Sequence, residues 1–259
     1  MLIVVSPAKS LDFESPLATK KHSTPTMLDR SAELVDVMAE KSPSELSAMM
    51  AISEALGVVN FDRFQDWQPP FTPENARPAL LAFNGDTYNG IDAANSFTER
   101  DFTHAQKTLR ILSGLYGVLR PLDLIQPYRL EMGSKVETSR GHTLYEFWGK
   151  DITEALNADL PASPGPKIVV NCASQEYFSA VDVDALDADV VTPTFLDSKD
   201  GGPYRMVSFF AKRARGAMAA YLIKNRVRSR RAITDFDAMG YAYDPDRSTD
   251  DQPVFLRQY

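Results

Sequence analysis

Two short apolar runs, each followed directly by polar residues, constrain the fold of this chain more than any other feature. They cover residues 2–5 (LIVV) and 167–170 (KIVV), and both are rich in β-branched residues. A continuous apolar run of this length, bounded by turn residues, is typical of a buried strand. We therefore predict a buried strand at each position.

Polar side chains follow both predicted strands. The residues concerned are Ser6, Lys9 and Asp12 after the first strand, and Asn171, Ser174, Glu176 and Tyr177 after the second. Polar groups just past the carboxyl end of a buried strand are well placed to line a ligand site. An ordinary surface turn after the first strand is the alternative interpretation.

Helix signals alternate with strand signals along the rest of the chain. Thr98, Thr143 and the pair Ser42-Pro43 have the positions of helix starts, with a helix of about fifteen residues expected after Thr143 and a further helix after Ser53. More strands are predicted at 79–83, 190–195, 204–209, 240–243 and 254–256. We therefore expect a mixed α/β (α+β) fold with a central mixed sheet and surrounding helices, in a single compact domain over residues 1–259.

The composition restricts where the protein works. No window approaches about 18 uninterrupted apolar residues, and the N-terminal apolar run is too short for a signal sequence, so no membrane contact is expected. The single cysteine, Cys172, cannot form an intramolecular disulfide. Both observations predict a cytoplasmic protein.

Charge is distributed very unevenly. The basic segment, residues 201–234, contains no Asp or Glu and nine of the 28 Lys and Arg residues, which leaves 19 cations against 35 acids elsewhere. Part of it, about 210–227, has the pattern of a basic helix that buries Ala214 and Met218 and exposes Lys212 and Arg213. Such asymmetry favours a basic surface for anions or nucleic acid. Pairing of the basic helix with acids elsewhere in the fold is the alternative.

A glycine-containing stretch, residues 110–133 (RILSGLYGVLRPLDLIQPYRLEMG), follows a predicted helix. Gly114 and Gly117 mark a turn, and glycine allows a backbone to approach a phosphate closely. A tight connection between two helices is the plain alternative. Glu131, at the end of the stretch, would repel a phosphate.

Several chemistries are disfavoured by the sequence. The three histidines lie in no metal-binding spacing, and a single cysteine makes a zinc cage improbable, so no metal is predicted. No GxGxxG, P-loop or GxSxG motif is present, so no cofactor is predicted. Cys172 follows a strand, where a small buried residue is commoner than a redox thiol.

The remaining candidates for a functional site are polar residues at the predicted turns. Six of them form a candidate catalytic set for an enzyme of unknown reaction: Lys9, Asp86, Arg129, Glu131, Asn171 and Lys212. Their mixture of carboxylates and cations resembles an active site more than a DNA surface, because carboxylates repel DNA. The sequence does not show whether they meet in one cleft.

At this point the motifs identify a resemblance. The segments VSPAKSLDF, FNGDTYNG, SGLYGVLRPLD with PYRLEMG, LYEFWG, NCASQEYF and AKRARGAM resemble the YaaA family of peroxide stress resistance proteins, in order and over essentially the whole chain. The resemblance implies a cytoplasmic bacterial protein that helps cells to survive hydrogen peroxide by limiting reactive iron and damage to DNA. It also implies a mixed α/β domain with a positively charged cleft, a helix-hairpin-helix element and DNA binding of weak sequence preference.

By that resemblance, the helix-hairpin-helix element falls on about 100–127, with its turn at Gly114 and Gly117. These glycines are three apart, whereas the usual turn of this kind has them two apart. The expected partner is the DNA backbone, and the candidate DNA-binding residues are Arg110, Gly114, Gly117, Arg120, Lys212, Arg213, Arg215 and Lys224. Two readings stay open, namely DNA binding and an enzyme with an anionic or nucleotide-like substrate. The oligomeric state is not predicted.

Overall fold

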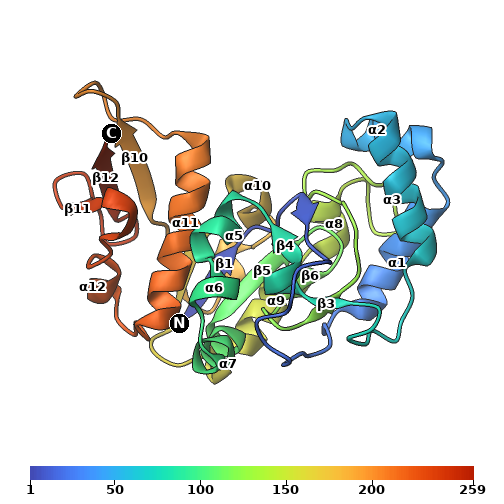
Figure 1. Cartoon of the computed structure of the whole chain (residues 1–259), viewed down its shortest axis with the longest axis horizontal. Coiled ribbons are helices and arrows are strands. Elements are labelled where there is room, and N and C mark those ends of the chain that lie inside the picture. The colour runs from blue at the N-terminus through green and yellow to red at the C-terminus, as the bar shows by residue number, and fades with distance from the viewer.

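A five-stranded sheet lies at the centre of the structure, a computed structural model that describes residues 1–259 (Figure 1). Its strand order is β6-β5-β1-β8-β9. The strands β5 (Leu109–Ser113), β1 (Leu2–Val5), β8 (Ile168–Cys172) and β9 (Asp189–Val191) run parallel, and β6 (Gly117–Leu119) pairs antiparallel with β5. The expected mixed α/β fold with a central mixed sheet is therefore confirmed.

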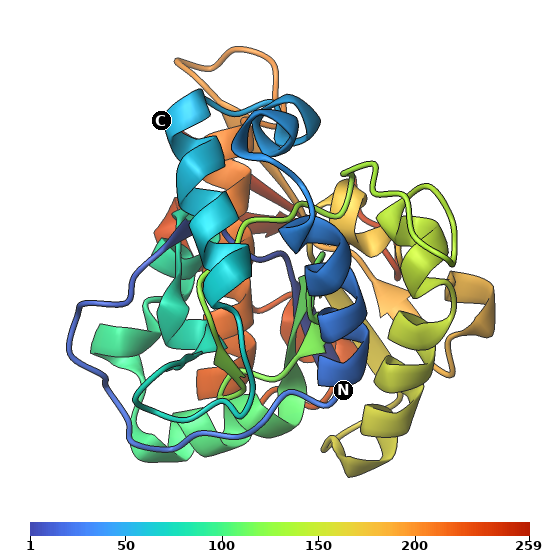
Figure 2. The same ribbon diagram turned by 90° about the vertical axis from the view of Figure 1, so that its right-hand side faces the viewer.

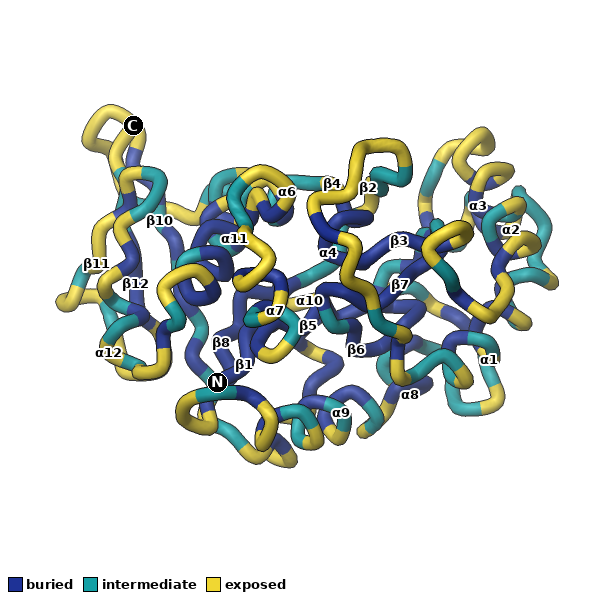
Figure 3. Tube along the Cα trace, turned by 60° about the horizontal axis from the view of Figure 1, so that its bottom comes forward, coloured by how far each residue is buried: buried dark blue, intermediate teal, exposed yellow.

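The three central strands are buried along their whole length, as the dark tube of Figure 3 shows. Strand β1 pairs with β5 on one side and with β8 on the other, with Val5 opposite Ile111 and Cys172. Because the sheet is covered on both faces at β1, only apolar side chains are tolerated along this strand. Both strands predicted from the apolar runs are confirmed.

A second, smaller sheet lies at one end of the molecule, on the left of Figure 1. It has the order β10-β12-β11 and contains β10 (Thr194–Ser198), β12 (Val254–Gln258) and β11 (Ala242–Asp244). Phe195, Phe236 and Phe255 pack together in its core. Asp197 is fully buried there and is neutralised by Arg257, whose Nη2 lies 2.7 Å from its carboxylate.

Three helices form a lobe at the opposite end, which faces the viewer in Figure 2. They are α1 (Leu28–Ala39), α2 (Pro43–Met50) and α3 (Glu54–Asp66). Ser42 and Glu45 form a capping box at the start of α2, and the Ser53 hydroxyl accepts a hydrogen bond from the Leu56 amide at the start of α3. Both helix starts predicted from the sequence are confirmed.

The remaining elements connect these parts. The helices are α4 (Ala79–Ala82), α5 (Asp86–Ile91), α6 (Ala93–Ser96), α7 (Glu99–Thr108), α8 (Leu144–Trp148), α9 (Asp151–Asp159), α10 (Gln175–Phe178), α11 (Ser208–Lys224) and α12 (Arg230–Ile233), with short 3-10 turns at 160–162, 183–185 and 238–240. Two small ladders pair β2 (Ser10–Leu11) with β4 (Phe83–Asn84), and β3 (Arg77–Pro78) with β7 (Leu124–Ile125). No helix has the length and apolar character needed to cross a membrane.

Helices α5 and α11 touch through their backbones. A Cβ atom added to Gly216 would lie 1.9 Å from the Thr87 carbonyl oxygen, and one added to Gly90 would lie 2.0 Å from that of Arg213. Neither position leaves room for a side chain, because real atoms do not approach so closely. The two glycines therefore set the distance between the helices, and the predicted basic helix is confirmed as α11.

The expected helix-hairpin-helix element is wrong. Residues 99–108 are helical, but the chain then forms the antiparallel strands β5 and β6, with Gly114 and Gly117 in a buried turn. A Cβ on Gly114 would meet the Leu130 carbonyl oxygen at 2.3 Å, and Gly117 adopts φ +65 against Trp148. The glycines serve internal packing and turn geometry, so their backbone does not face solvent.

Three other expectations fail in detail. Residues 79–82 form α4 rather than a strand, with only Phe83 in the short strand β4, and 204–209 contain only one bridge, between Arg205 and Asp197. The single helix expected after Thr143 is two, because Gly149 adopts φ +48 and ends α8. The first two cases involve short apolar segments, whose conformation is decided by tertiary contacts.

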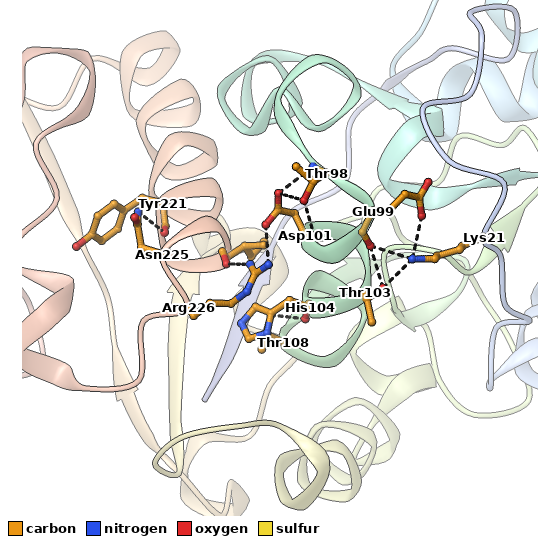
Figure 4. A network of polar contacts seen from close by, with 11 residues as sticks. Lys21, Thr98, Glu99, Asp101, Thr103, His104, Thr108, Tyr221, Asn225 and Arg226 are labelled. Atoms are coloured by element: carbon orange, nitrogen blue, oxygen red, sulfur yellow. Dashed lines mark hydrogen bonds and ion pairs between the residues drawn. The ribbon is translucent and has the colours of Figure 1, made fainter.

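A polar network joins the end of α11 to the start of α7 (Figure 4). The Arg226 Nη2 atom lies 2.7 Å from Asp101, whose carboxylate also accepts hydrogen bonds from the Thr98 backbone and hydroxyl. Asp101 is therefore both the third residue of a capping box and the partner of a cation on another helix. The nearby His104 is half-buried, and desolvation together with neighbouring Arg226, Arg228 and Lys107 lowers its pKa to about 4.

The glycine contact gives a first prediction. Gly216→Ala should lower the free energy of unfolding by about 1–3 kcal/mol, because the methyl group forces α5 and α11 apart. Lys224→Ala, at an exposed site on the same helix, should stay within about 0.5 kcal/mol of the natural protein. Urea denaturation measures both, and an unchanged stability of Gly216→Ala would show that the helices can separate freely.

His104 gives a second prediction. Its folded pKa is below the unfolded value of about 6.5, so the unfolded chain binds the proton first and stability falls as pH drops from about 6.5 toward 4. His104→Gln should reduce this loss. The measurement is the melting temperature of both proteins between pH 7 and pH 4.5, and parallel curves would contradict the assignment.

Candidate functional site

A polar cavity of about 410 Å³ opens at the carboxyl ends of β1 and β8. Five segments build it: the residues after β1, the start of α5, residues 128–131, the residues from the end of β8 into α10, and one side of α11. The lining residues with polar or ionisable side chains are Ser6, Lys9, Ser10, Asn84, Asp86, Thr87, Tyr128, Arg129, Glu131, Cys172, Ser174, Glu176, Tyr177, Lys212 and Arg215.

The sheet topology explains this location. From β1 the chain goes on to its neighbour β5, whereas from β8 it goes on to β9 on the opposite side of the sheet. Connections that diverge at two adjacent parallel strands leave a crevice at their carboxyl ends, where open α/β sheets commonly bind ligands. The cavity occupies that crevice.

Glu131 is the centre of a charge cluster in the cavity wall. Its carboxylate lies 2.6 Å from Lys9 Nζ and 3.0 Å from Arg129 Nη2. Arg129 and Glu131 expose only 17% and 22% of their side chains, whereas Lys9 exposes 62%. The Arg129 Nε atom is buried and has no hydrogen-bond partner. An unsatisfied buried donor is unfavourable. The Arg129 Nε–H group is therefore available to donate a hydrogen bond to one more acceptor.

Two further cations enter the cavity from α11. Lys212 is exposed, and Arg215 lies one turn further along and is half-buried. Burial lowers the pKa of Arg215, and no carboxylate contributes to that shift. Neither side chain forms an ion pair with an acid of this chain, in contrast to Lys9 and Arg129. A half-buried guanidinium without a counterion is suited to bind an anion.

Two carboxylates without cationic partners also line the cavity. Asp86 is half-buried at the start of α5, and Glu176 is exposed on α10. One Glu176 oxygen accepts a hydrogen bond from the Gly133 amide at 3.0 Å. Between the two strands, the Ser6 hydroxyl accepts from the Ser174 amide at 2.9 Å and donates to its hydroxyl at 3.2 Å.

Cys172 lies at the floor of the cavity, at the end of β8. Burial raises the pKa of its thiol to about 12, although the nearby Arg215 opposes the shift. Cys172 was expected to be a small buried residue, and it is buried. Its position as a lining residue was not expected. The available signal was its place just after the predicted strand at 167–170, which it shares with Asn171 and Ser174.

Five of the six candidate catalytic residues line this one cavity. They are Lys9, Asp86, Arg129, Glu131 and Lys212. Asn171 does not, because its amide group donates to Thr192 Oγ1 at 3.4 Å and accepts from the Ala173 backbone at 3.0 Å. These bonds shape the turn after β8. The catalytic roles of the five stay predictions.

The candidate DNA-binding residues are dispersed. Arg110 is buried and lies 2.6 Å from Asp159, and Gly114 and Gly117 are buried as well, so contact with a phosphate would require the β hairpin to open. Arg120 is half-buried, 3.9 Å from the same Asp159. The remaining four, all on α11, are Lys212, Arg213, Arg215 and Lys224.

Comparison with known families decides the relationship. The family model described as peroxide stress protein YaaA matches residues 1–247. The chain belongs to this family. The match spans every segment of the cavity. The stretch of residues 110–133, the longest of the segments that resemble the family, has two structural roles. Its first part forms the buried hairpin β5–β6, and its second part, Tyr128–Glu131, forms one wall of the cavity.

The carboxylates of the cavity do not form a metal-binding cluster. No group of three or more His, Cys, Asp or Glu side chains in the chain is arranged to hold a metal ion. Within the cavity the carboxylate of Glu131 is instead held by two cations.

The buried thiol gives a third prediction. With a pKa of about 12, only about one thiol in 10,000 is ionised at pH 8, compared with roughly a quarter for a free thiol of pKa about 8.5. Native Cys172 should therefore react with iodoacetamide at least about 100-fold more slowly than the denatured chain. Mass spectrometry of the alkylated fraction over time measures this, and equal rates would contradict the assigned burial.

Proposed function

We propose that this peroxide stress protein acts as an enzyme on a small anionic substrate bound in the polar cavity. The observation that carries the proposal is the convergence of Lys9, Asp86, Arg129, Glu131 and Lys212 from four separate segments onto one cavity. Structural ion pairs alone do not require such a cavity, and its size falls within the range of small-molecule sites. Protection of DNA and limitation of iron-dependent damage would follow from turnover of that substrate.

Charge supports an anionic substrate. Four cations line the cavity against three carboxylates, and one of those carboxylates, Glu131, is shared by Lys9 and Arg129. Lys212 and Arg215 are left for the substrate. Arg215 is the stronger candidate for direct contact, because its guanidinium is partly desolvated and interacts more strongly there than in water.

The Lys9–Glu131 contact supplies acid–base chemistry. The Glu131 carboxylate can accept a proton from a bound molecule, and the Lys9 ammonium group 2.6 Å away can donate one to another atom of that molecule. Arg129 fixes the other carboxylate oxygen, so the orientation of Glu131 is defined before a substrate arrives. We assign Glu131 as the general base, Lys9 as its proton-sharing partner and Arg129 as a positioning residue.

DNA binding is the second candidate function, and one observation favours it. Arg213 and Lys224 are exposed on α11, in a basic segment of the sequence that contains no acid. These cations would contact phosphates and would not read bases, which gives weak sequence preference. With Lys212 included, three engaged cations would give a log–log salt slope of about −3 on duplex DNA.

The enzyme proposal gives a fourth prediction. Glu131→Gln keeps the size of the side chain but removes the base, so a strain that depends on this protein should lose peroxide survival. The folded protein and its affinity for duplex DNA should be unchanged, as measured by circular dichroism and fluorescence anisotropy. Retained survival would contradict the role of Glu131.

The DNA proposal gives a fifth prediction. Arg213→Glu with Lys224→Glu should weaken duplex binding by at least about tenfold at low salt, equally for unrelated sequences. Neither residue lines the cavity, so substrate binding should persist. Fluorescence anisotropy over a salt series measures the effect, and an unchanged affinity would remove DNA binding through α11 as a function.

A further inference from the structure

We infer that the cavity selects a dipolar ligand, with an oxyanion at one end and an amino or other N–H donor group at the other. The inference rests on the proposed function and specifies its substrate class. It follows from how the seven charged residues of the lining divide into paired and unpaired groups. An anion site alone would not place two unpaired carboxylates in the lining of the same cavity.

The paired group is the cluster of Lys9, Glu131 and Arg129. Glu131 contacts both cations, at 2.6 Å and 3.0 Å, so most of its charge is compensated within the protein. A ligand gains little from the charge of either partner in such a cluster, because it must first compete with the existing contact. Recognition of ligand charge therefore depends on the four remaining groups.

The unpaired cations form the anion end of the cavity. Lys212 and Arg215 are one helical turn apart, so their side chains project from the same side of α11. Burial lowers the pKa of Arg215 and no acid compensates it. A phosphate or carboxylate group would supply the missing counterion and accept hydrogen bonds from the guanidinium.

Two unpaired carboxylates in the lining are available to donor groups of a ligand. Asp86 and Glu176 lie on α5 and α10, and neither makes an ion pair with a cation of the chain. The Gly133 amide occupies one oxygen of Glu176, which leaves the other oxygen available. An ionised carboxylate only accepts hydrogen bonds, so these two groups select ligand N–H or O–H donors and repel a second anion.

The glycine contact between α5 and α11 sets the position of Asp86 relative to Arg215. Thr87, next to Asp86, touches Gly216, which is next to Arg215, through backbone atoms. The relative position of Asp86 and Arg215 is therefore set by two helices that cannot approach or separate without altering that contact. Pro7, Ala8 and Leu130 supply apolar lining within the same cavity, suited to a short carbon linker.

A chain-length series of probes tests this inference. Aminoethyl, aminobutyl and aminohexyl phosphate carry both groups, whereas ethyl, butyl and hexyl phosphate lack the amine. Titration calorimetry or ligand-observed NMR on the full chain should give at least about tenfold tighter binding of the aminoalkyl phosphate at one length or more. The matching aminoalkyl carboxylates show which oxyanion is preferred, and a preference for either supports the inference.

Variants test the unpaired cations and the unpaired carboxylates separately. Arg215→Gln, and the exposed Lys212→Gln as a second variant, should weaken aminoalkyl and alkyl phosphates alike. Asp86→Asn with Glu176→Gln should abolish the advantage of the amine and leave alkyl phosphate binding unchanged or tighter. Arg213→Gln, an exposed cation on the same helix outside the cavity, is the matched control and should change neither affinity.

Two results would overturn the inference. One is equal affinity of aminoalkyl and alkyl phosphates at all three lengths, and the other is an amine advantage that persists without the two carboxylates. Neither result decides the proposed function, which is tested separately by the survival in peroxide of a strain that carries Glu131→Gln. Loss of that survival together with equal probe affinities would mean that the cavity is an active site for a purely anionic substrate.

Discussion

The backbone contact between α5 and α11 is the constraint on which the rest of the site depends. Gly90 and Gly216 allow the two helices to touch where any side chain would hold them apart. Helix α5 follows β4 of the small β2–β4 ladder, and α11 also contacts the central strands β1 and β8, so the contact holds the segment after β4 against the helix that packs on the central sheet. One wall of the cavity carries Asp86 and the other carries Lys212 and Arg215, and the glycines fix the space between them.

Part of this could be predicted from the sequence because the signals are local. The apolar run at 2–5, the caps at Ser42, Ser53 and Thr98, and the alternation along α11 depend on neighbouring residues and are found as expected. The polar residues that follow the two buried strands also gave part of the cavity, namely Ser6, Lys9, Ser174, Glu176 and Tyr177. Their convergence was not predictable, since it depends on strand order. The sheet places β8 beside β1, so that Ser6 and Ser174, 168 positions apart in the sequence, form a hydrogen bond.

The glycine stretch shows where local reasoning fails. Gly114 and Gly117 were interpreted as an exposed phosphate-facing turn, but they lie in a buried β hairpin packed against Leu130 and Trp148. Glycine marks any close approach of a backbone, and the sequence does not say whether a ligand or the protein itself approaches. The same ambiguity hid the role of Gly90 and Gly216. Glu131, which did not suit a DNA surface, is the centre of the charge cluster in the cavity.

The central claim is that peroxide protection depends on the cavity and not on the basic surface of α11. Lys9→Gln and Arg213→Gln test it as a matched pair, because both side chains are exposed and each change removes one positive charge. The decisive measurement is survival after hydrogen peroxide in a strain that has only the variant protein. The account predicts loss of protection with Lys9→Gln and full protection with Arg213→Gln. Protection that survives Lys9→Gln but is lost with Arg213→Gln would contradict it.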